Sequence, residues 1–156
     1  MAFQASGVVA AWLAVQAGGR NYLMPLGQSG EIFPWAGVQP VPYTKPWFLG
    51  IANLRGTLAG VIDLASLLGH GVTRSEPALA ESSLLAFNAA LEVNAALLVD
   101  RLQGLRSADA FVRTEPAPEH SPAFFGPVHI DEAGHRWQEL QLQRLSQTSE
   151  FLSIRA

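Results

Sequence analysis

The stretch that decides the fold is Trp47-Phe48-Leu49-Gly50-Ile51-Ala52-Asn53-Leu54-Arg55-Gly56-Thr57-Leu58-Ala59-Gly60-Val61-Ile62-Asp63-Leu64. Two apolar runs flank a polar turn at residues 53–56. Asn53 favours a turn because its side chain bonds back to the backbone, and Gly56 tolerates positive φ. The pattern therefore predicts two buried strands joined by a tight turn. Arg55 is a permanent cation within this turn, so it needs a carboxylate or carbonyl partner, or a position facing a partner protein.

Composition limits the class of protein. The chain has 156 residues, of which 49% are hydrophobic and only 15% are charged, and this predicts one compact unit with part of its surface covered by a partner. The net charge is -3, with no cluster of four basic residues, so we expect no nucleic-acid binding. The absence of cysteine and of any apolar run of about 18 residues predicts no disulfide and no membrane insertion. We expect no signal peptide and a cytoplasmic protein.

The rest of the chain contains many short apolar runs separated by glycine and proline. Expected strands cover residues 8–17, 21–26, 31–33, 82–89, 93–100, 102–112 (broken at Gly104), 128–130 and 136–142. Gly18-Gly19 predicts a two-residue hairpin turn, and residues 141–147 predict a short helix. Residues 70–81 are polar and irregular and are expected to link two halves. The many short strands and the glycine and proline turns predict an all-β fold with partly closed sheets. Residues 12–17 resemble residues 84–89, and this repeat leaves open whether the fold contains two similar small barrels in tandem.

No arrangement of reactive side chains favours catalysis. The spacing of His70, His120, His129 and His135 matches no metal-binding motif, so we interpret them as solvated loop histidines. Asp63 and Asp100 each end an apolar run. An acid–base pair is one interpretation of these two carboxylates, and a helix cap or surface bend is the one we favour. We expect no enzyme activity, no cofactor and no metal.

Three matches place the chain beside a known family. Residues 48–56, with Asn-Leu-Arg-Gly followed by Val61-Ile62-Asp63-Leu64, resemble the core motif of the CheW-like domain. Residues 96–102, Ala-Leu-Leu-Val-Asp-Arg-Leu, are similar to a second family strand, and Glu31-Ile32 stands where the family has a Glu-Ile pair. The resemblance spans residues 10–147, and the ends and proline content are most similar to the pilus-associated, PilI-like branch of twitching motility. One departure is Gly60, where the family usually has proline.

The resemblance implies a single CheW-like domain over residues 1–156. Its fold would be two interlocked five-stranded SH3-like barrels with a shared core and one or two short helices. The first barrel would cover about residues 8–69 plus exchanged strands, and the second about residues 82–147. It further implies a non-catalytic adaptor that couples a CheA-type histidine kinase to the hairpin tip of a methyl-accepting chemotaxis receptor, recruited to membrane-bound receptor arrays.

The resemblance also implies the residues that bind partners or shape the interface. Arg55 would pair with Glu31 in a partly buried, bidentate ion pair that holds the binding surface in shape. The receptor would lie near Gly50, Ile51, Val99 and Leu102, and the kinase near residues 27–32 and 58–61. The complete set of expected site residues is Glu31, Ile32, Gly50, Ile51, Asn53, Arg55, Gly56, Leu58, Val61, Val99 and Leu102.

Two other functions stay open on the sequence. One is a competing or inhibitory CheW-like protein that binds the kinase without the receptor. The other is a small-ligand-binding β-barrel, which requires a closed, polar-lined pocket.

Overall fold

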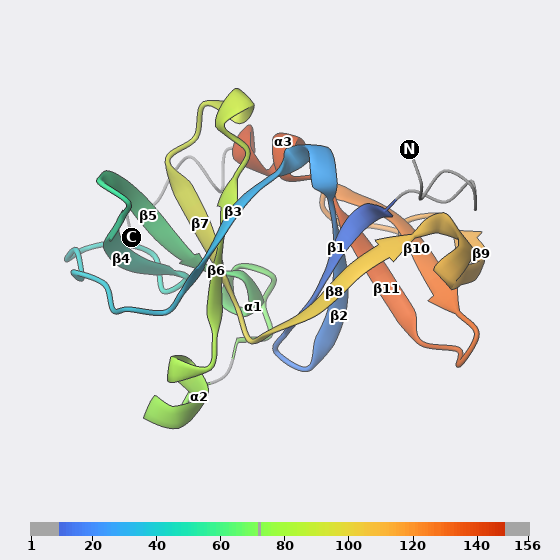
Figure 1. Cartoon of the computed structure of the whole chain (residues 1–156), viewed down its shortest axis with the longest axis horizontal. Helices are drawn as coiled ribbons and strands as arrows, with labels where there is room; N and C mark the ends of the chain where they lie inside the picture. Colours follow the sequence, from blue (N-terminus) through green and yellow to red (C-terminus); the bar gives the residue numbers. More distant parts are fainter. Residues whose placement is uncertain (1–9, 72, 149–156) are drawn as a thin grey trace, which may run out of the picture.

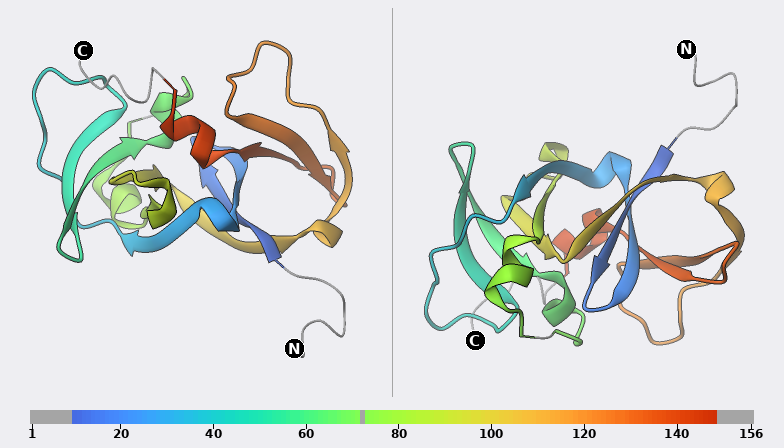
Figure 2. Two further views of the ribbon diagram at one scale, coloured as in Figure 1. Left: turned by 90° about the horizontal axis from the view of Figure 1, so that it is seen from above. Right: turned by 60° about the horizontal axis from the view of Figure 1, so that its bottom comes forward.

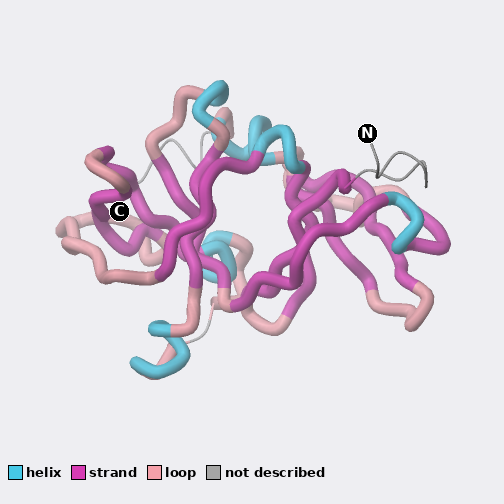
Figure 3. Tube along the Cα trace, viewed as in Figure 1, coloured by secondary structure: helices cyan, strands magenta, loops and turns pink. Residues whose placement is uncertain are grey.

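The structure is a computed structural model that describes residues 10–71 and 73–148. Its strands form two separate sheets, which make up the two halves of the molecule in Figure 1 and are coloured as strands in Figure 3. The described residues also contain three short α-helices, α1 (Leu64–Leu67), α2 (Glu76–Ala80) and α3 (Leu142–Ser146). The predicted all-β class is confirmed, with one short helix more than the one or two expected.

One sheet combines the beginning and the end of the chain. Its six strands are, in spatial order, β8 (Arg101–Ser107), β1 (Ala10–Ala17), β2 (Arg20–Pro25), β11 (Arg136–Leu140), β10 (Phe125–Asp131) and β9 (Phe111–Glu115). Neighbouring strands are antiparallel except for β2 and β11, which are parallel. This sheet has six strands, so the expectation of five strands in each barrel is wrong for this half.

The other sheet is built from the middle of the chain. Its five strands are, in spatial order, β3 (Ser29–Pro34), β6 (Ser83–Phe87), β7 (Ala95–Val99), β5 (Thr57–Asp63) and β4 (Phe48–Leu54). β6 and β7 therefore lie beside β3 and β5 and not with the later strands. A division of the chain at residues 70–81 does not coincide with the division between the sheets, because strand pairing joins segments across that link.

Local turn chemistry explains the first hairpin. Gly18 and Gly19 have φ of 59° and 77°, which is the geometry of a primed two-residue turn and confirms the predicted connection between β1 and β2. Pro25 is the last residue of β2, where its missing N–H does not interrupt the sheet.

The structure differs from the sequence prediction at residues 70–81 and at Gly104. Residues 70–81 contain the helix α2, whose first turn is capped by Ser75 Oγ accepting a hydrogen bond from Ala78 N at 3.2 Å. β8 continues through Gly104, and the break expected there occurs at the 3-10 helix Ala108–Ala110. The helix follows from a local N-cap that the sequence interpretation overlooked, and β8 continues through Gly104 because it pairs with β1 on both sides of that glycine.

The two sheets share a hydrophobic core. Val15 and Met24 from the six-stranded sheet and Leu85 and Leu97 from the five-stranded sheet belong to one cluster, and all four are fully buried. α3 lies where the two sheets meet and contributes Leu142 and Leu145 to the same cluster (Figures 1 and 2). Since burial of such a side chain stabilises the fold by about 1.5–3 kcal/mol, the core holds the two sheets together.

Candidate partner-binding site

The predicted turn at residues 53–56 projects Arg55 from the end of the β4–β5 hairpin. Asn53 Oδ1 accepts a hydrogen bond from Gly56 N at 2.7 Å, and Arg55 and Gly56 have φ of 52° and 85°. Arg55 Nη2 lies 2.8 Å from Glu31 Oε2, so the predicted ion pair is confirmed. β3 and β4 are the two edges of the five-stranded sheet, and this pair connects the β3 edge to the β4–β5 turn.

The predicted burial of this pair is wrong. The Arg55 side chain is 77% exposed and the Glu31 side chain is 46% exposed. Among the described residues, Asn53, Gly56, Thr57 and Leu58 of this turn region are exposed as well, so the charges lie outside the packed core. Water screens the attraction, so the pair contributes at most about 1 kcal/mol to stability. Both charged groups are accessible to a partner.

A groove lies against the ion pair. It has a volume of about 530 Å3, and its wall includes Phe33 of β3, Ala59 of β5 and Phe87 of β6 besides Glu31 and Arg55. Two apolar neighbours of the ion pair in sequence are also exposed, Ile32 at 40% and Leu58 at 65%. Ile32 and Leu58 do not line the groove, whose wall also includes the polar residues Asn88 and Asn94. The exposed charges, the groove and the two exposed aliphatic side chains all lie at this end of the five-stranded sheet, which makes it the best candidate for a protein-binding surface.

The other expected site residues do not form one surface with it. Val61 and Val99 are fully buried in the core. Gly50 has φ of 143°, and a side chain there would meet the backbone oxygen of Gln39. Leu102 is 39% exposed but belongs to β8 of the other sheet.

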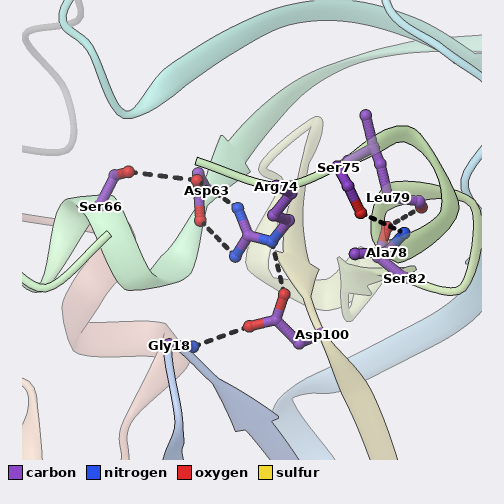
Figure 4. Close-up of polar contacts among 9 residues, drawn as sticks. All are labelled: Gly18, Asp63, Ser66, Arg74, Ser75, Ala78, Leu79, Ser82 and Asp100. Atoms are coloured by element: carbon purple, nitrogen blue, oxygen red, sulfur yellow. Dashed lines mark hydrogen bonds and ion pairs between the residues drawn. The ribbon is translucent and has the colours of Figure 1, made fainter. Parts of the chain in front are cut away.

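The sequence interpretation missed a buried cation. Arg74 donates to both oxygens of Asp63, with distances of 2.7 Å from Nη1 and 3.1 Å from Nη2, and to Asp100 Oδ1 from Nε at 2.5 Å (Figure 4). Asp63 stands at the N-cap position of α1 without capping its backbone, because its carboxylate binds Arg74 and Ser66. Asp63 and Asp100 are thus partners of an arginine and not an acid–base pair. The only sequence feature that could have indicated this shared partner is that Asp63 and Asp100 each end an apolar strand.

The interpretation of His129 as a solvated loop residue is also wrong. It is 7% exposed, and its Nε2 lies 3.0 Å from Glu139 Oε1 while its Nδ1 lies 3.2 Å from Thr114 Oγ1. His129 lies in strand β10, and its side chain packs against the ring of Trp12 on the buried face of the six-stranded sheet. In the described ranges, no group of three or more histidines and acids is arranged to hold a metal ion.

His70 and Tyr22 form a second polar pair under the β1–β2 hairpin. The Tyr22 hydroxyl lies 2.6 Å from His70 Nε2. Burial raises the pKa of Tyr22 to about 12, although the nearby Arg20 works to lower it. Burial and the charge of Arg20 lower the pKa of His70. Both groups are therefore neutral near pH 7 and have a structural role.

The chain is similar in sequence to proteins of a known family. The family model of the CheW-like domain matches residues 11–150. The chain belongs to the CheW-like domain family. It is 30% identical over 152 residues to the protein PilI of Pseudomonas aeruginosa, covering 94% of this chain and 82% of that protein. This likeness supports the expected PilI-like branch.

A solved structure has the same fold. The scaffolding protein TtCheW of Thermoanaerobacter tengcongensis superposes with a TM-score of 0.73 at 20% identity, covering 90% of this chain and 94% of that one. The two sheets are thus the two SH3-like barrels of the CheW fold, as expected from the resemblance. The part of the chain that the structure describes has no helix with the length and hydrophobicity of a membrane span.

Proposed function

We propose that this protein is a non-catalytic adaptor that couples a CheA-type histidine kinase to a methyl-accepting chemoreceptor, in a pathway that controls type IV pili and twitching motility. Membership of the CheW-like family and the likeness to PilI support this role. The protein would act in the cytoplasm and would be recruited to receptor arrays at the membrane. The observation that carries the proposal is the exposed Arg55–Glu31 pair beside a groove with both polar and apolar lining residues.

The kinase's regulatory domain would bind at this end of the five-stranded sheet. The exposed side chains of Ile32 and Leu58 supply apolar contact area, and the ion pair supplies two oriented charges. Because burying apolar area gives affinity while charges mainly set register and partner choice, this combination suits a specific signalling contact. The receptor tip would contact the half-buried Ile51 and the exposed Leu102, which lie on different sheets.

Calorimetric titration with the purified regulatory domain of a CheA-type histidine kinase from the same organism tests the proposal. Leu58→Asp is expected to weaken binding at least about tenfold, which corresponds to about 1.4 kcal/mol. Val112→Asp is the matched control, because Val112 is 59% exposed on β9 of the other sheet. Equal affinity of wild type and Leu58→Asp would refute the assigned surface.

A second titration with the receptor's hairpin tip separates the adaptor from its alternative. Binding of both partners at once supports coupling. Binding of the kinase domain alone supports the competing, kinase-only role. If neither partner binds, the proposed function fails.

A further inference from the structure

The described chain passes between the two sheets at two places. The first is the 3-10 helix Leu26–Gln28, between β2 and β3. The second is Asp100 alone, which separates Val99 at the end of β7 from Arg101 at the start of β8. Because one residue makes the second crossing, the backbone angles at Asp100 bear directly on how one sheet is oriented relative to the other.

Asp100 is held from the side of the six-stranded sheet. Its backbone N donates to Gln16 O at 2.8 Å, and its Oδ2 accepts from Gly18 N at 2.7 Å. Both partners belong to the β1–β2 hairpin, so two hydrogen bonds tie the crossing to that hairpin.

Arg74 holds Asp100 from the other side. Its guanidinium spans the carboxylates of Asp100 and Asp63, and Asp63 is the last residue of β5 in the five-stranded sheet (Figure 4). The side chains of Arg74 and Asp63 are each only 7% exposed. Burial alone would raise the pKa of Asp100, but hydrogen bonds from Arg74 and Gly18 lower it below its ordinary value. Removing Arg74 would leave two carboxylates facing each other in a partly dry site, where like charges repel strongly.

A cleft of about 670 Å3 adjoins this network, between the β1–β2 turn and α2. Gly19, Ser75 and Glu81 are among its lining residues. The shared apolar core connects the sheets elsewhere, whereas at this edge the connection is made by the charged groups.

We propose that Arg74 is a positioning residue, a clasp between Asp63 and Asp100 that fixes the angle between the two barrels. The planar guanidinium suits this role because it binds two carboxylates in fixed directions, which an ammonium group does not do. The inference deepens the proposed function, since partner surfaces on different sheets require a fixed relative orientation. It assigns to Arg74 an effect on the receptor contact that spans both sheets, and little effect on the kinase contact that uses one sheet.

Pulsed electron–electron double resonance between two spin labels tests the relative orientation of the two sheets in the free protein. The chain has no cysteine, so spin labels can be placed uniquely at Thr57→Cys on β5 and Val112→Cys on β9, both exposed. We expect a single narrow distance distribution in the parent protein. Arg74→Lys and Asp100→Asn should broaden or shift it, while Arg113→Lys, a side chain 63% exposed in an ion pair on β9, should not.

The binding arm uses the same variants with the receptor tip and the kinase regulatory domain. Arg74→Lys is expected to weaken the receptor-tip contact by about tenfold and the kinase-domain contact by less than about threefold, within the range seen for residues that couple sites without touching a ligand. If Arg74→Lys and Asp100→Asn are folded and the distance distribution is unchanged, the proposed positioning role of Arg74 is wrong. Complete unfolding of both also overturns it, because a positioning role requires that the shared core folds without the clasp. If the parent protein binds neither partner, the proposed function fails while the distance measurement still decides the clasp.

Discussion

The indole N–H of Trp12 donates a hydrogen bond to Glu139 Oε1 at 2.9 Å, which joins β1 to β11 although β2 lies between these strands in the sheet. Such a contact across an intervening strand requires the sheet to curl, as in a barrel. Glu139 is 8% exposed and also accepts a hydrogen bond from Gln141 Nε2. The buried carboxylate thus collects donors from separate parts of the chain, and its burial is tolerated for that reason.

Trp12→Phe should destabilise the protein by about 1.5–3 kcal/mol, the usual contribution of a hydrogen bond to a charged group. Urea unfolding followed by circular dichroism measures the change. Phe111→Leu is the control, because it alters the ring packed 5.6 Å from Trp12 and leaves the hydrogen bond in place. That variant should lose only about 1 kcal/mol. Wild-type stability of Trp12→Phe would show that Glu139 does not depend on this donor.

Arg55→Ala and Glu31→Ala should each change the free energy of unfolding by less than about 1 kcal/mol, because the ion pair is solvent-exposed. Chemical denaturation provides the test. Leu97→Ala, in the fully buried core, serves as a reference and should cost about 2–5 kcal/mol. A loss of 3 kcal/mol in either charge variant would mean that the pair is buried in solution.

Gly50→Ala should destabilise the protein by about 1–3 kcal/mol, since it combines a positive φ with a side chain placed against the backbone. The added Cβ would lie 2.3 Å from Gln39 O, so the bridge between Gln39 and Ile51 would have to shift. Gly27→Ala is a matched control with negative φ and open space around it, and it should be close to neutral. Thermal melting of both variants distinguishes the two positions, and equal melting temperatures would contradict the strained geometry.

Stability should fall in alkali because of Tyr22. Its pKa in the folded protein is about 12, against about 10 in an unfolded chain, so the folded state holds this proton more tightly. The resulting stabilisation is complete below pH 10 and is lost as the pH rises through 12. Urea unfolding at pH 9 and pH 11 should show a loss of about 1 kcal/mol in the wild type from this group.

Tyr22→Phe should remove this part of the pH dependence while lowering stability at all pH values, because the contact with His70 Nε2 is also lost. Tyr43→Phe, at a side chain 88% exposed, should keep the wild-type pH dependence. The same alkaline loss in Tyr22→Phe as in the wild type would exclude Tyr22 as its source.

Much of the architecture was predictable from local patterns. Turn residues such as Gly18-Gly19 and Asn53 with Gly56 mark hairpins by their own backbone preferences, so the all-β class and most strands followed from them. The pairing of Arg55 with Glu31 followed from the family resemblance and is confirmed. Its exposure was not predictable, because burial depends on what packs around a turn.

The sequence alone determined that the chain is a β protein of the CheW-like family, because alternating apolar runs, turn residues and a family motif are all read locally along the chain. Only the tertiary structure decided which strands share a sheet, that His129 is buried, and that Arg74 lies between Asp63 and Asp100. These features depend on contacts between residues far apart in sequence. One sequence contains no local signal for such contacts, since any of its carboxylates is chemically able to accept the same guanidinium.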